Sequence, residues 1–242
     1  MRVAVVSDIH GNLHALDAVL AAVDAERPDE LWCLGDVVGY GPRPNECCET
    51  IARRADVSLV GNHDLGVLGH ESLEAFADDA AAAARWTRDV LTEASRTFLE
   101  ALAPVASREG VGLYHGSPRD PVWEYVLSAE VGVASLLAAP ERLVLVGHSH
   151  VALEVGLDEG TVRAELAPPG TEVDLSSGRW LLNPGSVGQP RDGDPAAAFL
   201  LLDLRARRAL FRRVPYPIER TQEEIRAAGL PESLAQRLGE GL

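Results

Sequence analysis

The strongest constraint in this sequence is a pattern in which short apolar runs lead directly into residues that can bind metal. Residues 3–6 are apolar and mostly β-branched, and Asp8 and His10 follow almost at once. A short apolar run bounded by turn residues is typical of a strand buried on both faces, as in a parallel sheet. Because α/β sheets bind ligands beyond the carboxyl ends of such strands, Asp8 and His10 are candidate site residues.

The segment that follows predicts a parallel strand pair. Apolar residues at helical spacing indicate an amphipathic helix over about residues 13–25, and a second strand is predicted at 30–34. A strand–helix–strand unit implies parallel pairing with a right-handed crossover. We therefore expect Asp36, which follows the second strand, to reach the same sheet edge as Asp8.

Three further predicted strands also end at potential ligands, each beside a glycine. These strands and the residues after them are 57–60 with Asn62, His63 and Asp64, 111–114 with His115, and 142–146 with His148 and His150. The donors outside the His63–Asp64 pair are too many for one four-coordinate ion and suit two. Two divalent ions about 3.5–4 Å apart, bridged by a carboxylate, suit phosphoryl transfer. Mixed oxygen and nitrogen donors without thiolate favour Mn²⁺, Fe or Zn²⁺, of which we expect Mn²⁺.

The remaining segments predict one α/β domain over residues 1–242. An alanine-rich stretch at about 66–103 is expected to be helical and is a candidate cap beside the site. From 151 to 214, short strands separated by turn residues predict antiparallel hairpins. Asn45 is expected to cap a helix that runs to about residue 55, and the tail at about 218–240 is expected to be helical.

Charge and cysteine content restrict the partners and the compartment. The net charge is −15, and all 22 basic residues are arginine. Such an acidic chain disfavours binding to long nucleic acid or to anionic membranes.

No apolar run approaches the roughly 20 residues that span a bilayer, and no signal segment precedes the first strand. Cys33 lies in an apolar run and Cys47 adjoins Cys48, which indicates a reducing compartment. We expect a cytoplasmic protein with a small phosphorylated substrate.

Taken together and in order, the five motifs resemble those of the calcineurin-like metallophosphoesterases over nearly the whole chain. The matching segments are Asp8-Ile-His10, Gly35-Asp36-Val-Val-Gly39, Gly61-Asn62-His63-Asp64, His115-Gly116 and Gly147-His148-Ser-His150. Five linked motifs are far more specific than any one of them. The later segment Asn183-Pro-Gly-Ser-Val-Gly-Gln-Pro-Arg191 is similar to the compact prokaryotic YfcE-like phosphodiesterase branch.

This resemblance implies a fold and a division of roles. The implied fold is a four-layer α/β/β/α sandwich of two mixed sheets flanked by helices. The implied ligands are Asp8, His10 and His150 for the first metal, Asn62, His115 and His148 for the second, and Asp36 between the two. In the family, a hydroxide that bridges the metals attacks phosphorus in line. His63 would stabilise or protonate the leaving oxygen, and Asp64 would orient its imidazole, as a general acid requires.

One motif departs from the family pattern and leaves the substrate open. Protein phosphatases and symmetric dinucleoside tetraphosphatases of the family continue the second motif as Gly-Asp-x-x-Asp-Arg-Gly, whereas this chain has Tyr40 in place of the arginine. Arg43, Arg119 or Arg191 could replace it, and Arg191 is our candidate for substrate binding. We predict a phosphodiesterase. The alternatives are a phosphomonoesterase or protein phosphatase, a nucleotide hydrolase, and, from another class, a non-catalytic interaction scaffold.

Other polar and aromatic residues have simpler explanations. His14 and His70 are expected on helix surfaces, and the arginines at 205–213 on the solvent side of a hairpin. Tyr40, Trp123 and Tyr125 could line a substrate pocket, although aromatic packing is the favoured interpretation.

Overall fold

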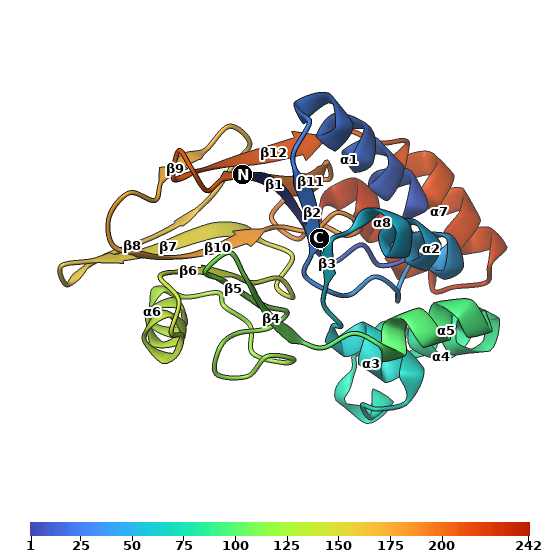
Figure 1. The fold of residues 1–242 in the computed structure, drawn as a ribbon. Coiled ribbons are helices and arrows are strands. Elements are labelled where there is room, and N and C mark those ends of the chain that lie inside the picture. The colour runs from blue at the N-terminus through green and yellow to red at the C-terminus, as the bar shows by residue number, and fades with distance from the viewer.

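Two six-stranded sheets form the centre of the computed structural model, which describes residues 1–242 (Figure 1). The first sheet has the order β3-β2-β1-β11-β12-β9, with bounds Val57–Ser58, Glu30–Cys33, Arg2–Val6, Ala197–Asp203, Arg208–Val214 and Glu172–Asp174. The second has the order β4-β5-β6-β10-β7-β8, with bounds Val105–Arg108, Val111–Tyr114, Leu143–Leu145, Arg179–Pro184, Ala152–Asp158 and Thr161–Leu166. Both sheets mix parallel and antiparallel pairs, as predicted.

Helices flank the two sheets. They are α1 Leu13–Glu26, α2 Pro44–Arg54, α3 Asn62–Leu68, α4 Asp78–Val90, α5 Glu93–Glu100, α6 Ala129–Ala138, α7 Ile218–Ala227 and α8 Glu232–Glu240, with a 3-10 turn, η1, at Leu73–Ala75. Helix α6 packs on the second sheet and α1 on the first, and the remaining helices gather at the same end of the molecule as α1 (Figure 1). None of these helices combines the length and the apolar character that crossing a bilayer would need.

Parallel pairing brings the predicted motifs to one edge. Strands β1, β2 and β3 run parallel to one another, and so do β5 and β6. The segments that follow these five strands therefore leave the two sheets in a common direction. This arrangement confirms the strand–helix–strand unit predicted for the first 34 residues.

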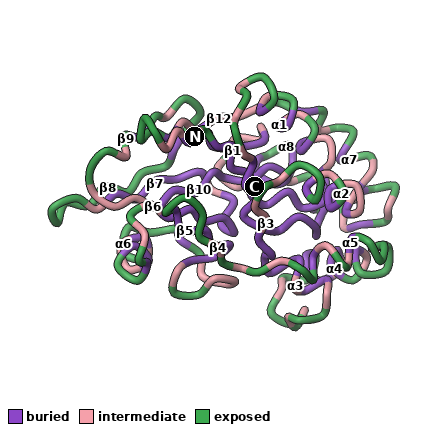
Figure 2. Tube along the Cα trace, in the orientation of Figure 1, coloured by how far each residue is buried: buried purple, intermediate pink, exposed green.

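The core is built by alternation along the strands. Val3 and Val5 of β1 belong to the buried cluster between the sheets, whereas Ala4 and Val6 belong to the cluster beneath the helices. A strand buried on both faces needs apolar residues at every position, which explains the continuous run at 3–6. Burying a large aliphatic side chain contributes about 1.5–3 kcal/mol. Figure 2 shows this burial concentrated on the strands of both sheets, with β8 exposed.

Two local predictions were wrong. Helix α2 begins at Pro44, which suits the first helical position, and Arg43 rather than Asn45 is its N-cap. Asn45 instead binds the α4–α5 turn, where it donates to the carbonyl of Val90 and accepts from the N–H of Thr92. The side chain of Arg213, expected to face solvent, is only 6% exposed and pairs with Asp192. Strands β4 and β9 were missed because both are short and lie at sheet edges.

The segment at 66–103 is largely helical, as expected. Ala80 and Ala83 of α4 pack against Leu234 and Leu238 of α8. That the segment 66–103 acts as a cap, and that residues 1–242 form a single domain, stay predictions.

Candidate dinuclear metal centre

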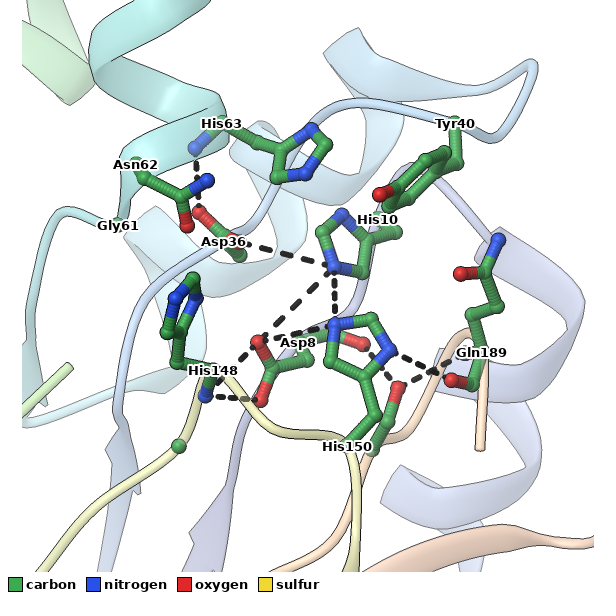
Figure 3. Close-up of polar contacts among 12 residues, drawn as sticks. Asp8, His10, Asp36, Tyr40, Gly61, Asn62, His63, His148, His150 and Gln189 are labelled. Atoms are coloured by element: carbon green, nitrogen blue, oxygen red, sulfur yellow. Dashed lines mark hydrogen bonds and ion pairs between the residues drawn. The ribbon is translucent and has the colours of Figure 1, made fainter. Parts of the chain in front are cut away.

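The residues that follow the five strands come together at one place between the sheets. Figure 3 shows those that follow β1, β2, β3 and β6. The first sheet brings Asp8, His10, Asp36 and Asn62, and the second brings His115, His148 and His150. The potential ligand atoms form three overlapping groups, each within 4.8 Å: Asp8–His10–His150, His10–Asp36–His63 and Asp36–His115–His148. All of these side chains are buried.

His10 and His150 face each other through ring nitrogens that are both acceptors. Nδ1 of His10 lies 3.1 Å from the carbonyl oxygen of Val38, and Nδ1 of His150 lies 2.6 Å from that of Gln189. A carbonyl only accepts, so each Nδ1 carries the hydrogen and each Nε2 of a neutral ring carries a lone pair. The two Nε2 atoms are 2.9 Å apart, and Oδ1 of Asp8 lies 3.5 Å from Nε2 of His150. Two lone pairs and a carboxylate directed at one point fit a shared cation.

His115 and His148 are anchored in the same way. Nδ1 of His115 donates to the carbonyl of Leu34 at 2.9 Å, which directs Nε2 toward Asp36 Oδ2 at 3.4 Å. His148 uses the opposite nitrogen, because its Nε2 donates to the carbonyl of Trp123 at 3.1 Å. Metal-ligating histidines commonly donate their second ring N–H to a carbonyl or carboxylate, which fixes the ring. All four predicted histidine ligands therefore have the anchoring that such a site requires.

Asp36 lies between the two groups of ligands. Its Oδ1 accepts from the backbone N–H of His63 at 2.9 Å, whereas its buried Oδ2 has no hydrogen-bond partner. Oδ2 lies 3.7 Å from Nε2 of His10 and 3.4 Å from Nε2 of His115. Asn62 Oδ1 also lies 3.1 Å from Nε2 of His115. Since a buried carboxylate needs compensating charge, this free oxygen fits a ligand shared by two cations.

Burial shifts the pKa values of this centre in both directions. It raises the pKa of Asp8 to about 7, and it lowers the pKa of His148 to about 3 and that of His63 to about 4. Burial also opposes ionisation of Asp36, but the imidazoles of His115 and His63 outweigh it and hold the pKa of Asp36 well below its usual range. Burial likewise disfavours the charged form of His115, yet Asp36 raises the pKa of His115 to about 9. Ligation by His115 would therefore release a proton.

Five of the predicted ligands occupy left-handed backbone conformations. The φ angles are 56° for Asp8, 51° for His10, 52° for Asp36, 64° for His148 and 60° for His150. Asp and His enter this region more readily than most residues, yet each such position costs on the order of 1–3 kcal/mol. Strain of this kind clusters at functional sites, where the surrounding structure holds it in place.

Two glycines allow the loops to approach these ligands. A Cβ atom at Gly61 would lie 2.0 Å from Oδ1 of Asp36, and one at Gly147 would lie 2.1 Å from Oγ of Ser7. Neither distance leaves room for a side chain. Glycine is therefore required at both strand ends by close packing around the ligands.

His63 packs over the centre without a polar partner for its ring. Its ring centroid lies 4.8 Å from that of His10, 4.4 Å from that of Tyr40 and 5.0 Å from that of Phe76. The buried Nδ1 has no hydrogen-bond partner. Aromatic contacts therefore position this ring. Phe76 was not predicted as a site residue, because it lies outside every motif.

Asp64 has a different role from the predicted one. Its Oδ1 accepts from the N–H of Val38 and its Oδ2 from the N–H of Gly61, both at 3.0 Å. Both oxygens accept from backbone donors and the ring of His63 bonds to neither, so the prediction that Asp64 orients the imidazole of His63 was wrong. Asp64 instead ties together the loops that follow β2 and β3.

Of the three arginines considered for phosphate binding, Arg191 lies at the rim of the centre. Arg43 pairs with glutamates of α2 and α7, and Arg119 pairs with Glu124. Arg191 Nη2 donates to the hydroxyl of Tyr40 at 3.1 Å, and the guanidinium lies 5.6 Å from the centroid of that ring. The ring of Tyr40 in turn lies 4.7 Å from that of His10. Arg191 thus brings a guanidinium beside the position where other family members carry their arginine.

Aromatic residues form another part of the rim. The ring of Tyr125 stacks on that of His148, with centroids 3.9 Å apart and 15° between the planes, and the residue is 46% exposed. Trp123 lies edge-on to Phe76, with centroids 5.3 Å apart. Tyr40, Trp123 and Tyr125 thus pack around the predicted ligands, and Tyr125 is also partly open to solvent.

Comparison with known proteins identifies the family. Residues 1–207 match the calcineurin-like phosphoesterase superfamily domain. The chain belongs to this superfamily. A metallophosphoesterase from Sphaerobacter thermophilus shares 43% identity and a TM-score of 0.91, and the alignment covers 100% of this chain and 99% of that one. An uncharacterized protein of Methanocaldococcus jannaschii is 39% identical over 241 residues, which cover 98% of this chain and 96% of that protein.

These findings confirm the predicted family and the two-sheet fold, and they make the chain a phosphoric ester hydrolase. A symmetrical bis(5'-nucleosyl)-tetraphosphatase of Klebsiella pneumoniae is 41% identical over 71 residues, which cover 28% of this chain and 25% of that enzyme. The alignment with the YfcE phosphoesterase of E. coli has a TM-score of 0.43. The narrower YfcE-like branch therefore stays a prediction.

Proposed function

We propose that this hydrolase acts on small phosphodiesters with two divalent cations bound between its sheets. The observation that carries the proposal is the set of four histidines, each anchored to a backbone carbonyl and aimed at the oxygen donors. The residues that would hold the cations are Asp8, His10 and His150 for one, Asn62, His115 and His148 for the other, and Asp36 for both. When bound, such cations supply positive charge to phosphoryl oxygens and lower the pKa of a water molecule. Mn²⁺ suits this mixed donor set, as do Fe and Zn²⁺.

His63 stabilises or protonates the oxygen that leaves phosphorus. A general acid must lie within hydrogen-bond reach of the leaving group. The ring nitrogen of His63 lies within 4.8 Å of the ligand atoms of His10 and Asp36, and Nδ1 has no protein partner. The backbone N–H of His63 also donates to Asp36, so the position of the ring is tied to that of the shared carboxylate.

Arg191 binds a non-reacting phosphoryl oxygen. Its guanidinium is held by Gln189 Oε1 at 2.8 Å and by the hydroxyl of Tyr40 at 3.1 Å. Gln189 also supplies the carbonyl that anchors His150, so the arginine is linked to the ligand set through a neighbouring residue. A guanidinium is permanently charged and matches the geometry of phosphate oxygens.

A diester is favoured over a monoester because the rim offers a surface for a second ester group. Tyr125 stacks on His148 and is 46% exposed, so its ring can also contact an aromatic group of the substrate. A nucleotide hydrolase is the second candidate, supported by the local similarity to the tetraphosphatase. The net charge of −15 disfavours long nucleic acid as the substrate. Three free, buried cysteines support a cytoplasmic location.

The deciding experiment is a substrate panel with Mn²⁺-loaded protein. An aryl phosphodiester, the matched monoester and a dinucleoside tetraphosphate are compared at equal concentration, with metal content measured on the same sample. We expect the highest kcat/KM for the diester. A higher value for the tetraphosphate would favour the nucleotide hydrolase. Full metal occupancy with no hydrolysis of any substrate would support the interaction scaffold instead.

A further inference from the structure

Strand β8, Thr161–Leu166, is an uncovered edge of the second sheet. All six of its residues are exposed, and the tip of the β7–β8 hairpin projects past α6 at the left of Figure 1. The strand pairs with β7 on one side only, in an uninterrupted register from Leu153–Leu166 to Asp158–Thr161. An open edge without proline or bulge presents unpaired backbone groups that can accept another strand.

We infer that β8 pairs antiparallel with β8 of a second copy of this chain, about a twofold axis at Ala164. In this register, Arg163 lies opposite Glu165 of the second copy and Val162 lies opposite Leu166 of the second copy. The twofold axis repeats both pairs. Opposite charges and apolar residues are thus matched across the interface, which is the self-complementarity that a symmetric dimer needs.

The backbone supports this register. The N–H of Ala167 donates to the carbonyl of Ala152 at 2.9 Å. Because hydrogen-bonded positions alternate along an antiparallel strand, the backbone groups of Arg163 and Glu165 point toward β7. Those of Val162, Ala164 and Leu166 therefore point outward, and pairing them about Ala164 would form about six hydrogen bonds. The two Arg–Glu pairs then occupy non-hydrogen-bonded positions, where facing side chains are closest.

Other antiparallel registers are less favourable. An axis at Arg163 or at Glu165 places that charge opposite itself, and like charges directly opposite are destabilising. An axis between Arg163 and Ala164 places outward backbone groups opposite inward ones, which breaks the hydrogen-bond ladder. Among axes between Arg163 and Glu165, the one at Ala164 therefore satisfies both charge and hydrogen bonding.

The same pairing covers apolar surface beside α6. Val162 and Leu166 are 45% and 64% exposed. Both lie on the face of the hairpin whose β7 residues, Leu153 and Val155, pack with α6. Leu166 also lines a cavity of about 280 Å³ beside the segment that precedes α6. Val162 of the second copy would lie against Leu166 at the wall of this cavity and remove both side chains from water.

The mass of the full chain in solution tests the interface. Sedimentation equilibrium over a concentration series should show a species of twice the 25.9 kDa monomer. Glu165→Arg places Arg163 opposite an arginine and leaves the internal ion pair of Arg163 with Glu154 in place, so we expect at least about tenfold weaker dimerisation. Glu165→Gln, which removes the charge without placing two arginines opposite each other and also keeps the ion pair of Arg163 with Glu154, should weaken dimerisation less than Glu165→Arg. A monomeric wild type, or a dimer that is insensitive to Glu165→Arg, would overturn the inference.

A cross-link tests the register even if a charge variant fails to fold. Ala164→Cys would place two thiols on the axis, where hydrogen-bonded residues have Cα atoms about 5.5 Å apart, within disulfide range. The three native cysteines are buried and unpaired. Oxidation should give a covalent dimer that reductant reverses. Val105→Cys, at 39% exposure on the opposite edge strand β4, is the matched control and should not cross-link. Equal cross-linking of the two variants, or none with Ala164→Cys, would contradict the proposed axis.

Discussion

The two sheets contribute different chemistry to the metal centre. The first supplies both aspartates and the Asn62 amide, whereas the second supplies imidazoles alone. The groups Asp8–His10–His150 and Asp36–His115–His148 each combine residues from both sheets. Even the backbone N–H of His148, from the second sheet, donates to the Asp8 carboxylate of the first. Neither sheet alone can bind a cation in this way, so the site depends on how the two sheets pack.

The largest effect is expected from removing the carboxylate that serves both groups. Asp36→Ala should release both cations and lower activity by roughly 10⁴-fold or more, which corresponds to about 5.5 kcal/mol. Metal analysis of the purified variant, together with the diester assay, measures this effect. Asp17→Ala, at an exposed position of α1, is the control and should change neither quantity. Two retained cations per Asp36→Ala chain would show that the shared carboxylate is not needed for binding them.

Replacing His63, which follows β3 of the first sheet, tests whether activity can be lost while metal binding is kept. We expect His63→Ala to lose about 10²–10⁴ in rate, as is typical for a general acid, while metal content stays the same. The exposed His70 provides the matched substitution, His70→Ala, which should leave the rate unchanged. Loss of metal in His63→Ala would instead make this residue a ligand.

Chelation tests whether cations join the two sheets. At a free metal concentration of 100 times Kd, binding stabilises the folded chain by about 2.7 kcal/mol, so its removal should lower Tm by roughly 5–10 °C. Differential scanning calorimetry with and without chelator measures this shift. Asp36→Ala should show no such shift, because it has no cation to lose. A wild-type Tm unaffected by chelator would mean that the sheets hold together independently of metal.

The smallest effect is expected at the rim beside the second sheet. Tyr125→Ala removes one aromatic stacking contact worth about 0.5–1.5 kcal/mol, so KM for an aryl diester should rise at most about tenfold. The effect should be absent for a diester with only small alkyl groups, which is the internal control. A comparable loss with both substrates would indicate that Tyr125 acts by positioning His148.

That the predicted ligands lie close together could be foreseen from sequence because it depends on local rules. Asp8, Asp36 and His115 each follow an apolar strand, and parallel pairing brings the ends of such strands together. The orientation of His63 could not be predicted in this way. Its neighbour in sequence, Asp64, binds backbone N–H groups of two loops. Phe76, which lies 13 positions after His63, contacts the ring instead. Contacts of this kind depend on tertiary packing that no local pattern encodes.

At the predicted ligands with positive φ angles, the residue that favours activity is not the residue that favours stability. Glycine at His148 or His150 would relieve backbone strain on the order of 1 kcal/mol while deleting a donor. Selection for thermal tolerance alone would therefore erode this chemistry, one ligand at a time. Natural descendants that have lost the activity are expected to carry glycine or asparagine at these positions.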